Sequence, residues 1–145
     1  LVSLIKHGFI FISVALMLFG CGDEPEVEQT AEDVAVAFFD AVYNQNDIDK
    51  ALALSTPNFA EELGKYITTK NAARRLFNMS FDSVQIDAAL GDKNVRREFK
   101  RSGKLVILFT GYRQDKLYKE MKEIRLVKKG DNWLVDELLP DPDFY

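Results

Sequence analysis

Histidine and cysteine, the side chains that most often serve as general bases, nucleophiles or zinc ligands near neutral pH, occur once each in this chain of 145 residues. They are His7 and Cys21, and neither residue type occurs after position 21. This distribution excludes an intrachain disulfide. Beyond Cys21 it also excludes a Cys/His zinc site, a Ser–His or Cys–His nucleophile and a histidine base.

Cys21 ends an apolar segment. Residues 8–20 (GFIFISVALMLFG) carry no charge, and Lys6 and His7 come directly before them. A membrane-spanning helix needs about 20 apolar residues, so this run is too short to cross a bilayer. Its length and its basic flank are typical of a secretory signal, with a buried core helix as the alternative interpretation.

The letters LFGC at 18–21 resemble the lipobox of bacterial lipoproteins, in which the signal is removed and the cysteine is lipidated. The resemblance implies a lipoprotein signal peptide at 1–20 and a palmitate-bearing anchor on Cys21. It also implies a protein of the cell envelope, and Gly22 after the cysteine, where Asp would favour the inner membrane, points to the outer membrane facing the periplasm. A buried structural thiol is the alternative for Cys21.

The segment after the cysteine is acidic. Residues 22–30 (GDEPEVEQT) contain four acids and one proline, which makes them too polar to pack into a core. We therefore expect the lipidated cysteine and an acidic tether over residues 21–30, and a folded domain over residues 31–145.

Helices are predicted in the first half of this domain. Thr30 with Asp33 three residues later resembles a capping box, and an apolar stripe from Val34 to Val42 follows at helical spacing. Asp47 is expected to cap a second helix, and Pro57 suits the first turn of a third. A weaker helical pattern covers residues 71–79.

Strands are predicted in the second half, because the apolar period changes to two from Val84 onward. Ser102-Gly103 is expected to form a two-residue hairpin loop, and an apparent change of parity predicts a β-bulge near Lys122. Helices followed by an antiparallel meander predict an α+β fold, with N-terminal helices packed on a bent four-stranded antiparallel sheet.

The patterns at 35–59 (AVAFFDAVYNQNDIDKALALSTPNF) and 128–139 (KKGDNWLVDELL), with the long strand between them, resemble the nuclear-transport-factor-2-like superfamily. The resemblance covers roughly residues 30–139 and rests on topology rather than on catalytic residues. It implies a cone-shaped α+β domain with an internal pocket, and a homodimer in which one sheet covers another. Along the central strand, two apolar sets alternate and therefore point to opposite faces of the sheet: Leu105, Ile107 and Phe109, and Val106 and Leu108. The helices cover only one face, so the set on the other face needs a second cover.

Aromatic residues of the helical half are the candidates for lining that pocket. Phe39, Tyr43 and Tyr66 would accept a small apolar ligand, with simple core packing as the alternative. Asp40 and Asp87 are the only acids within apolar stretches, and both are expected at the surface. We therefore assign no catalytic residue, no cofactor and no metal site.

Charge is unevenly distributed along the chain. Residues 21–62 hold eleven acids and one base, residues 63–130 seventeen bases and seven acids, and residues 131–145 five acids and no base. Within the basic segment, one predicted hairpin carries the candidates for binding an anionic envelope surface, which are Arg96, Arg97, Lys100 and Arg101. The alternative is a solvated hairpin. Nucleic acid is not expected as a partner, because only Phe99 adds an aromatic ring and the signal implies export.

Together these features predict a membrane-anchored periplasmic lipoprotein with a non-catalytic ligand-binding or scaffolding domain. Two alternatives stay open. One is an isomerase- or cyclase-like enzyme that uses an Asp/Tyr pocket, and the other is an accessory subunit of a cell-envelope complex. Expected partners are the membrane, a second copy through the sheet, and a small apolar ligand or an anionic envelope surface.

Overall fold

The computed structural model describes residues 28–89 and 102–141. The expected signal peptide, Cys21 and most of the tether lie outside the described residues. So do the four hairpin bases Arg96, Arg97, Lys100 and Arg101. The helices are α1 (Ala31–Tyr43), α2 (Ile48–Ala53), α3 (Pro57–Gly64) and α4 (Thr69–Arg75), and the strands are β1 (Ser83–Ala88), β2 (Ser102–Arg113), β3 (Lys116–Lys129) and β4 (Asn132–Leu138).

Side-chain caps set where the helices begin. The Thr30 hydroxyl accepts a hydrogen bond from the Asp33 amide at 3.2 Å, and the Asp33 carboxylate accepts one from the Thr30 amide at 3.1 Å, which confirms the predicted capping box. Asp47 caps α2 and Pro57 occupies the first turn of α3, as expected. The fourth helix starts and ends earlier than the pattern from 71 to 79 predicted, because Thr68 caps it and it ends at Arg75.

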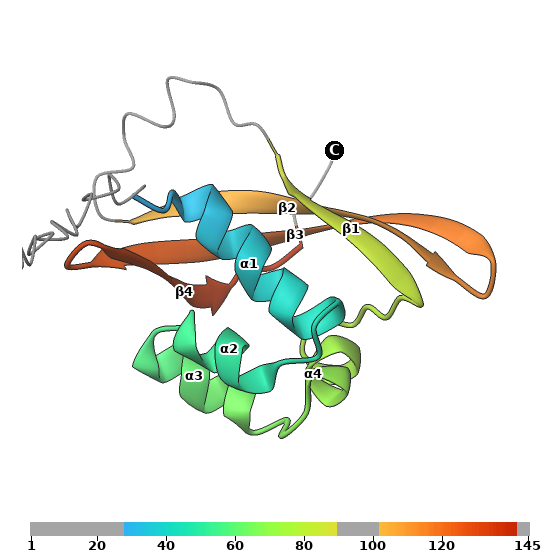
Figure 1. Cartoon of the computed structure of the whole chain (residues 1–145), viewed down its shortest axis with the longest axis horizontal. Coiled ribbons are helices and arrows are strands. Elements are labelled where there is room, and N and C mark those ends of the chain that lie inside the picture. Colours follow the sequence, from blue (N-terminus) through green and yellow to red (C-terminus); the bar gives the residue numbers. More distant parts are fainter. Residues whose placement is uncertain (1–27, 90–101, 142–145) are drawn as a thin grey trace, which may run out of the picture.

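The strands form one antiparallel sheet in the order β1-β2-β3-β4. Consecutive strands pair throughout, so the sheet is a meander with no crossover. The four helices lie together on one side of it (Figure 1). This arrangement confirms the α+β prediction of N-terminal helices on a four-stranded antiparallel sheet.

Two local predictions about the strands were wrong. Ser102 and Gly103 pair with Val127 and Leu126, so they belong to the β2–β3 ladder and not to a hairpin loop. Their polarity is tolerated there because Ser102 is exposed at the strand end.

The expected bulge near Lys122 is also absent, because Lys122, Ile124 and Leu126 are all buried on the same face of β3. Met121, the residue that suggested a change of parity, points to the other face. The register shift instead lies opposite Arg125 and Leu126. There β4 contributes one extra residue, Asp136, between Val135 and Glu137.

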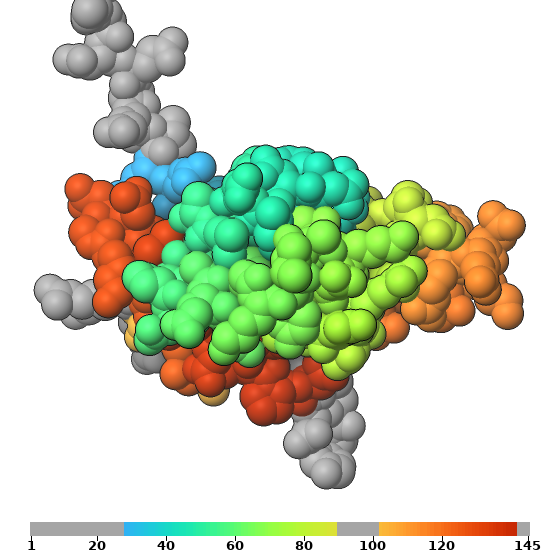
Figure 2. Space-filling model, turned by 90° about the horizontal axis from the view of Figure 1, so that it is seen from below, coloured from blue at the N-terminus to red at the C-terminus, as the bar shows by residue number. Residues whose placement is uncertain are grey.

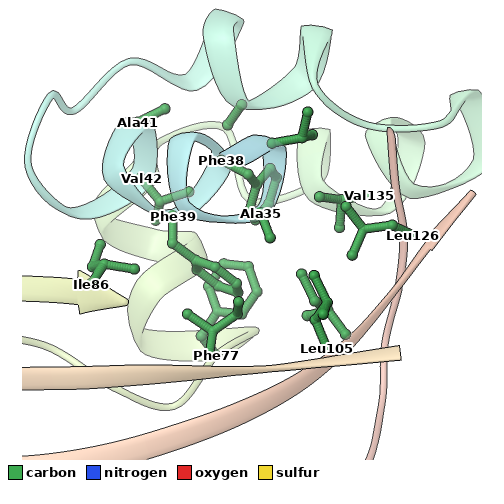
Figure 3. Close-up of a cluster of buried hydrophobic side chains, with 14 of the residues drawn as sticks. Ala35, Phe38, Phe39, Ala41, Val42, Phe77, Ile86, Leu105, Leu126 and Val135 are labelled. Atoms are coloured by element: carbon green, nitrogen blue, oxygen red, sulfur yellow. The ribbon is translucent and has the colours of Figure 1, made fainter. Parts of the chain in front are cut away.

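The inner surface of the sheet and the helices enclose one hydrophobic core (Figure 3). Leu105, Ile107 and Phe109 of β2 point into it and Val106 and Leu108 do not, which confirms that the two sets lie on opposite faces. The buried residues of this core run from Ala31 to Val135, so no described residue before α1 contributes a side chain to the core. Among the described residues, no helix is long and apolar enough to span a membrane.

The free edge of β4 is closed by the α2–α3 junction. The Thr56 amide donates to the Val135 carbonyl, and the Val135 amide donates to the Leu54 carbonyl, both at 2.8 Å. The Thr56 hydroxyl donates to the carboxylate of the bulged Asp136 at 2.9 Å. The bulge therefore directs a side chain to the cap of α3 and fastens the helices to the sheet.

Candidate functional site

The interior between helices and sheet is filled by aromatic rings. The Phe39 side chain is fully buried, and its ring centroid lies 5.0 Å from those of Phe38 and Phe109 and 5.2 Å from that of Phe77. All three contacts have the edge-to-face geometry that aromatic pairs prefer. Phe39, a candidate for a ligand pocket, therefore packs as a core residue, in keeping with the alternative interpretation of the aromatic set.

Tyr43 lies at the edge of the same ring cluster. Its ring centroid is 5.7 Å from those of Phe81 and Phe109, and its hydroxyl donates to the Met79 carbonyl at 3.3 Å. Burial raises the pKa of this phenol above its ordinary value, because the charged form would lose water. Tyr43 is thus a proton donor held in a neutral state by its surroundings.

Tyr66 is not part of this cluster. It follows α3, is half-buried, and its backbone carbonyl accepts a hydrogen bond from the Asn71 side chain at 3.1 Å. No aromatic contact among the described residues joins it to Phe39 or Tyr43. The structure brings two of the three candidate pocket residues together and leaves the third apart.

The two carboxylates considered as bases lie at the surface of the helical layer and of the sheet. Asp40, at the end of α1, accepts hydrogen bonds from the side chains of Asn44 and Gln45. Asp87 is exposed on β1 and accepts one from Gln85 at 2.9 Å. No cluster of three or more His, Cys, Asp or Glu side chains suited to a metal ion occurs within 28–89 and 102–141.

Lys122 is the one charged residue that is buried among the described residues. It lies on the helix-facing side of β3, and its ammonium group contacts the Asp141 carboxylate at 2.6 Å. Asp141 itself is largely exposed, so the ion pair sits at the rim of the core and holds the residues after β4 against β3. The sequence predicts this burial only if Lys122, Ile124 and Leu126 are assigned to the same face of one strand, with the residues between them on the other face.

The outer face of the sheet carries an apolar band. We define it by the half-buried residues Val106 and Leu108 and the exposed residues Tyr112, Leu117 and Met121. Tyr112 lies directly opposite Leu117, and Leu108 lies opposite Met121. Tyr112 and Leu117 are each 52% exposed, and Met121 is 36% exposed. Along β2 the band extends for about 20 Å, at ~3.3 Å per residue.

Polar groups divide and border the apolar band. Lys119 and Thr110 lie between the Leu108–Met121 pair and the Tyr112–Leu117 pair, and Arg125 pairs with Glu137 at 3.3 Å near the other end of the band. Apolar side chains mixed with charged groups at the edge are common in protein interaction surfaces. The alternation predicted that one of the two sets of β2 would need a second cover, and the structure shows that Val106 and Leu108 are that set. Tyr112, Leu117 and Met121 were missed, although continuing the same parity through the hairpin would have found them.

Comparison of the chain with protein-family models, with curated proteins and with solved structures found no match.

Proposed function

We propose that this protein is a lipid-anchored protein of the bacterial cell envelope, facing the periplasm from the outer membrane, whose nuclear-transport-factor-2-like domain is a scaffold and not an enzyme. The LFGC pattern and the acidic tether support the anchor. Phe39 and its neighbouring rings support a scaffolding role over an internal ligand site, because their side chains occupy the space between helices and sheet.

The outer apolar band is the observation that carries the proposed role. All four helices cover the opposite face, so this band has no cover from them. Apolar patches of this kind on a folded domain mark sites of association. We propose a second copy of this chain as the occupant, because a two-fold interface needs only one surface that fits itself, and because the resemblance implies sheet-on-sheet dimers.

The band is suited to such an interface in its shape and composition. Two sheets pack face to face at about 10 Å, with side chains of the two faces interdigitating. Leu108 and Met121 lie side by side at the middle of the long β2–β3 ladder, and the Tyr112–Leu117 pair extends the band to its hairpin end. Burial of these four side chains would supply the apolar centre of the interface.

The dimer is tested on the chain from residue 22 onward by native mass spectrometry and light scattering over a concentration series. We expect a dimer in the wild-type chain and a monomer in the double variant Leu117→Lys, Met121→Lys. The control Ile67→Lys makes the same change of chemistry away from the sheet, and it should still dimerise. A wild-type chain that stays monomeric over the whole series would contradict the proposed partner.

The anchor is tested separately, by labelling cells that express the full chain with radioactive palmitate. The wild-type protein should incorporate label and fractionate with the outer membrane, and Cys21→Ser should do neither. Incorporation by Cys21→Ser would show that Cys21 is not the lipidated residue. Native mass spectrometry of the protein from its own cells adds one further readout, because a different chain bound in place of the second copy would identify an accessory subunit of an envelope complex.

A further inference from the structure

The loop between α3 and α4 holds an apolar side chain in an unfavourable position. Ile67 is 76% exposed, the most exposed large hydrophobic residue of the described chain, and its backbone has φ +69°. The left-handed region is rare for any residue with a side chain, and for a β-branched residue it is a true outlier. The other described residues with positive φ, apart from one glycine, are polar: Asn46, Asn78, Gln114 and Asp115.

The fold itself gains little from isoleucine at this position. A side chain that remains three-quarters exposed gains little from burial, and the left-handed backbone conformation is unfavourable for a β-branched residue. Asparagine or glycine would adopt this left-handed conformation more easily, and the chain has asparagine at two other positions with positive φ, Asn46 and Asn78. Strain retained at an exposed apolar residue points to a use for that side chain outside the fold.

The surroundings of Ile67 are basic. Lys65, Lys70, Arg74 and Arg75 are all exposed, and the sequence has no acid between Glu62 and Asp82. None of these four bases takes part in the ion pairs found among the described residues. We call Ile67 with these four bases the basic tip.

The basic tip lies on the helical side of the molecule. The α3–α4 segment covers much of the surface that Figure 2 shows, on the side opposite the sheet. It is therefore a different face from the outer apolar band. A dimer formed through that band would leave the tip free.

An exposed aliphatic side chain ringed by lysine and arginine matches the chemistry of an anionic bilayer. Basic groups close to a membrane attract acidic lipid headgroups, and an apolar side chain among them enters the boundary between headgroups and acyl chains. Half-buried Tyr66, next to Ile67, adds a ring with a polar end, which suits the same boundary.

We propose that the basic tip is a membrane-contact site that binds the surface of an anionic phospholipid bilayer, with Ile67 inserted and the four bases over lipid phosphates. In the cell the contact rests on the proposed lipid anchor, which would keep the domain close to a bilayer. The ten residues from 21 to 30 reach at most about 33–36 Å, comparable with the width of a domain of this size. The anchored domain can therefore turn its basic tip to the membrane.

The test uses the chain from residue 22 onward, which lacks the anchor and keeps every residue of the described core. It is mixed with vesicles of phosphatidylethanolamine and phosphatidylglycerol, or of phosphatidylcholine alone, and the bound fraction is measured by sedimentation. We expect binding to the anionic vesicles only, and a decrease when the salt concentration is raised. Absence of binding to the anionic vesicles overturns the proposal.

Variants then assign the binding to the tip. Lys70→Gln and Arg74→Gln should each lower the partition coefficient about fivefold, and Ile67→Asn should lower it further without loss of folding. The matched control Lys129→Gln removes an exposed base elsewhere on the molecule, and it should bind like the wild type. Vesicle binding that survives all three tip variants, or that falls equally in this control, overturns the assignment. Because this chain carries no lipid, the result is independent of palmitate labelling at Cys21.

Discussion

Replacing Ile67 by asparagine should make the domain more stable, although it removes an apolar side chain. The left-handed conformation of Ile67 costs about 1–2 kcal/mol that asparagine largely avoids. Full burial of a side chain of this size is worth about 1.5–3 kcal/mol, and Ile67 is 76% exposed, so the change forfeits only about 0.4–0.7 kcal/mol. The free energy of unfolding should therefore rise by about 1 kcal/mol.

The assay is thermal and urea unfolding of the chain from residue 22 onward, followed by circular dichroism. A gain of ~1 kcal/mol corresponds to an increase of roughly 3–5 °C in the midpoint for a domain of this length. The urea midpoint should increase with no change in the slope of the transition, because the surface exposed on unfolding stays the same.

The matched control is Leu117→Asn, the same kind of change at an exposed apolar position of β3 without a positive φ. That variant should lose about 1 kcal/mol, because it gives up half-buried apolar surface and a strand-forming residue with no relief of strain. If Ile67→Asn is destabilised as much as Leu117→Asn, then no strain is stored at Ile67, and the reason for assigning the basic tip a role outside the fold is refuted.

Three further predictions concern the core. Gly111→Ala should lower the free energy of unfolding by about 1–3 kcal/mol in urea titrations, because a Cβ there would lie 2.6 Å from the Ser83 carbonyl oxygen. The control Gly64→Ala should not lower it, because the nearest atom to a Cβ at that position lies 4.0 Å away. Phe39→Ala should cost about 3–5 kcal/mol in the same assay, and a loss below 1 kcal/mol would show that Phe39 is not packed in the core. Tyr43 has a raised pKa in the folded state, so its contribution to the free energy of unfolding is complete below its ordinary pKa of 10.0 and is lost as the pH rises beyond that value. Tyr43→Phe should therefore reduce the loss of stability at alkaline pH. A pH profile of stability that does not change in this variant would count against the raised pKa.

Much of the fold follows from short stretches of sequence. The caps at Thr30, Asp47 and Thr56 are hydrogen bonds between residues three positions apart, so each depends only on its immediate neighbours. Alternation likewise places Leu105 and Val106 on opposite faces without any knowledge of the partner strand. The fold class and the starts of the first three helices were predictable for this reason, whereas the start of α4 was not.

The candidate surfaces were harder to predict, because exposure depends on what covers a residue. Tyr112 and Leu117 become one apolar pair only through the β2–β3 register. Phe39 was a pocket candidate by residue type, and only the rings of Phe38, Phe77 and Phe109 around it make it a core residue.

The sequence by itself determined which chemistry is missing after Cys21, because a side chain that is absent cannot act in any fold. It also determined the local elements, whose hydrogen bonds and periods are set by near neighbours. Only the tertiary structure decided the burial of Lys122, the bulge at Asp136 and the exposure of Ile67. Each of these depends on packing between segments far apart in the chain, such as Leu54–Thr56 against Val135, and that packing is a property of the whole fold.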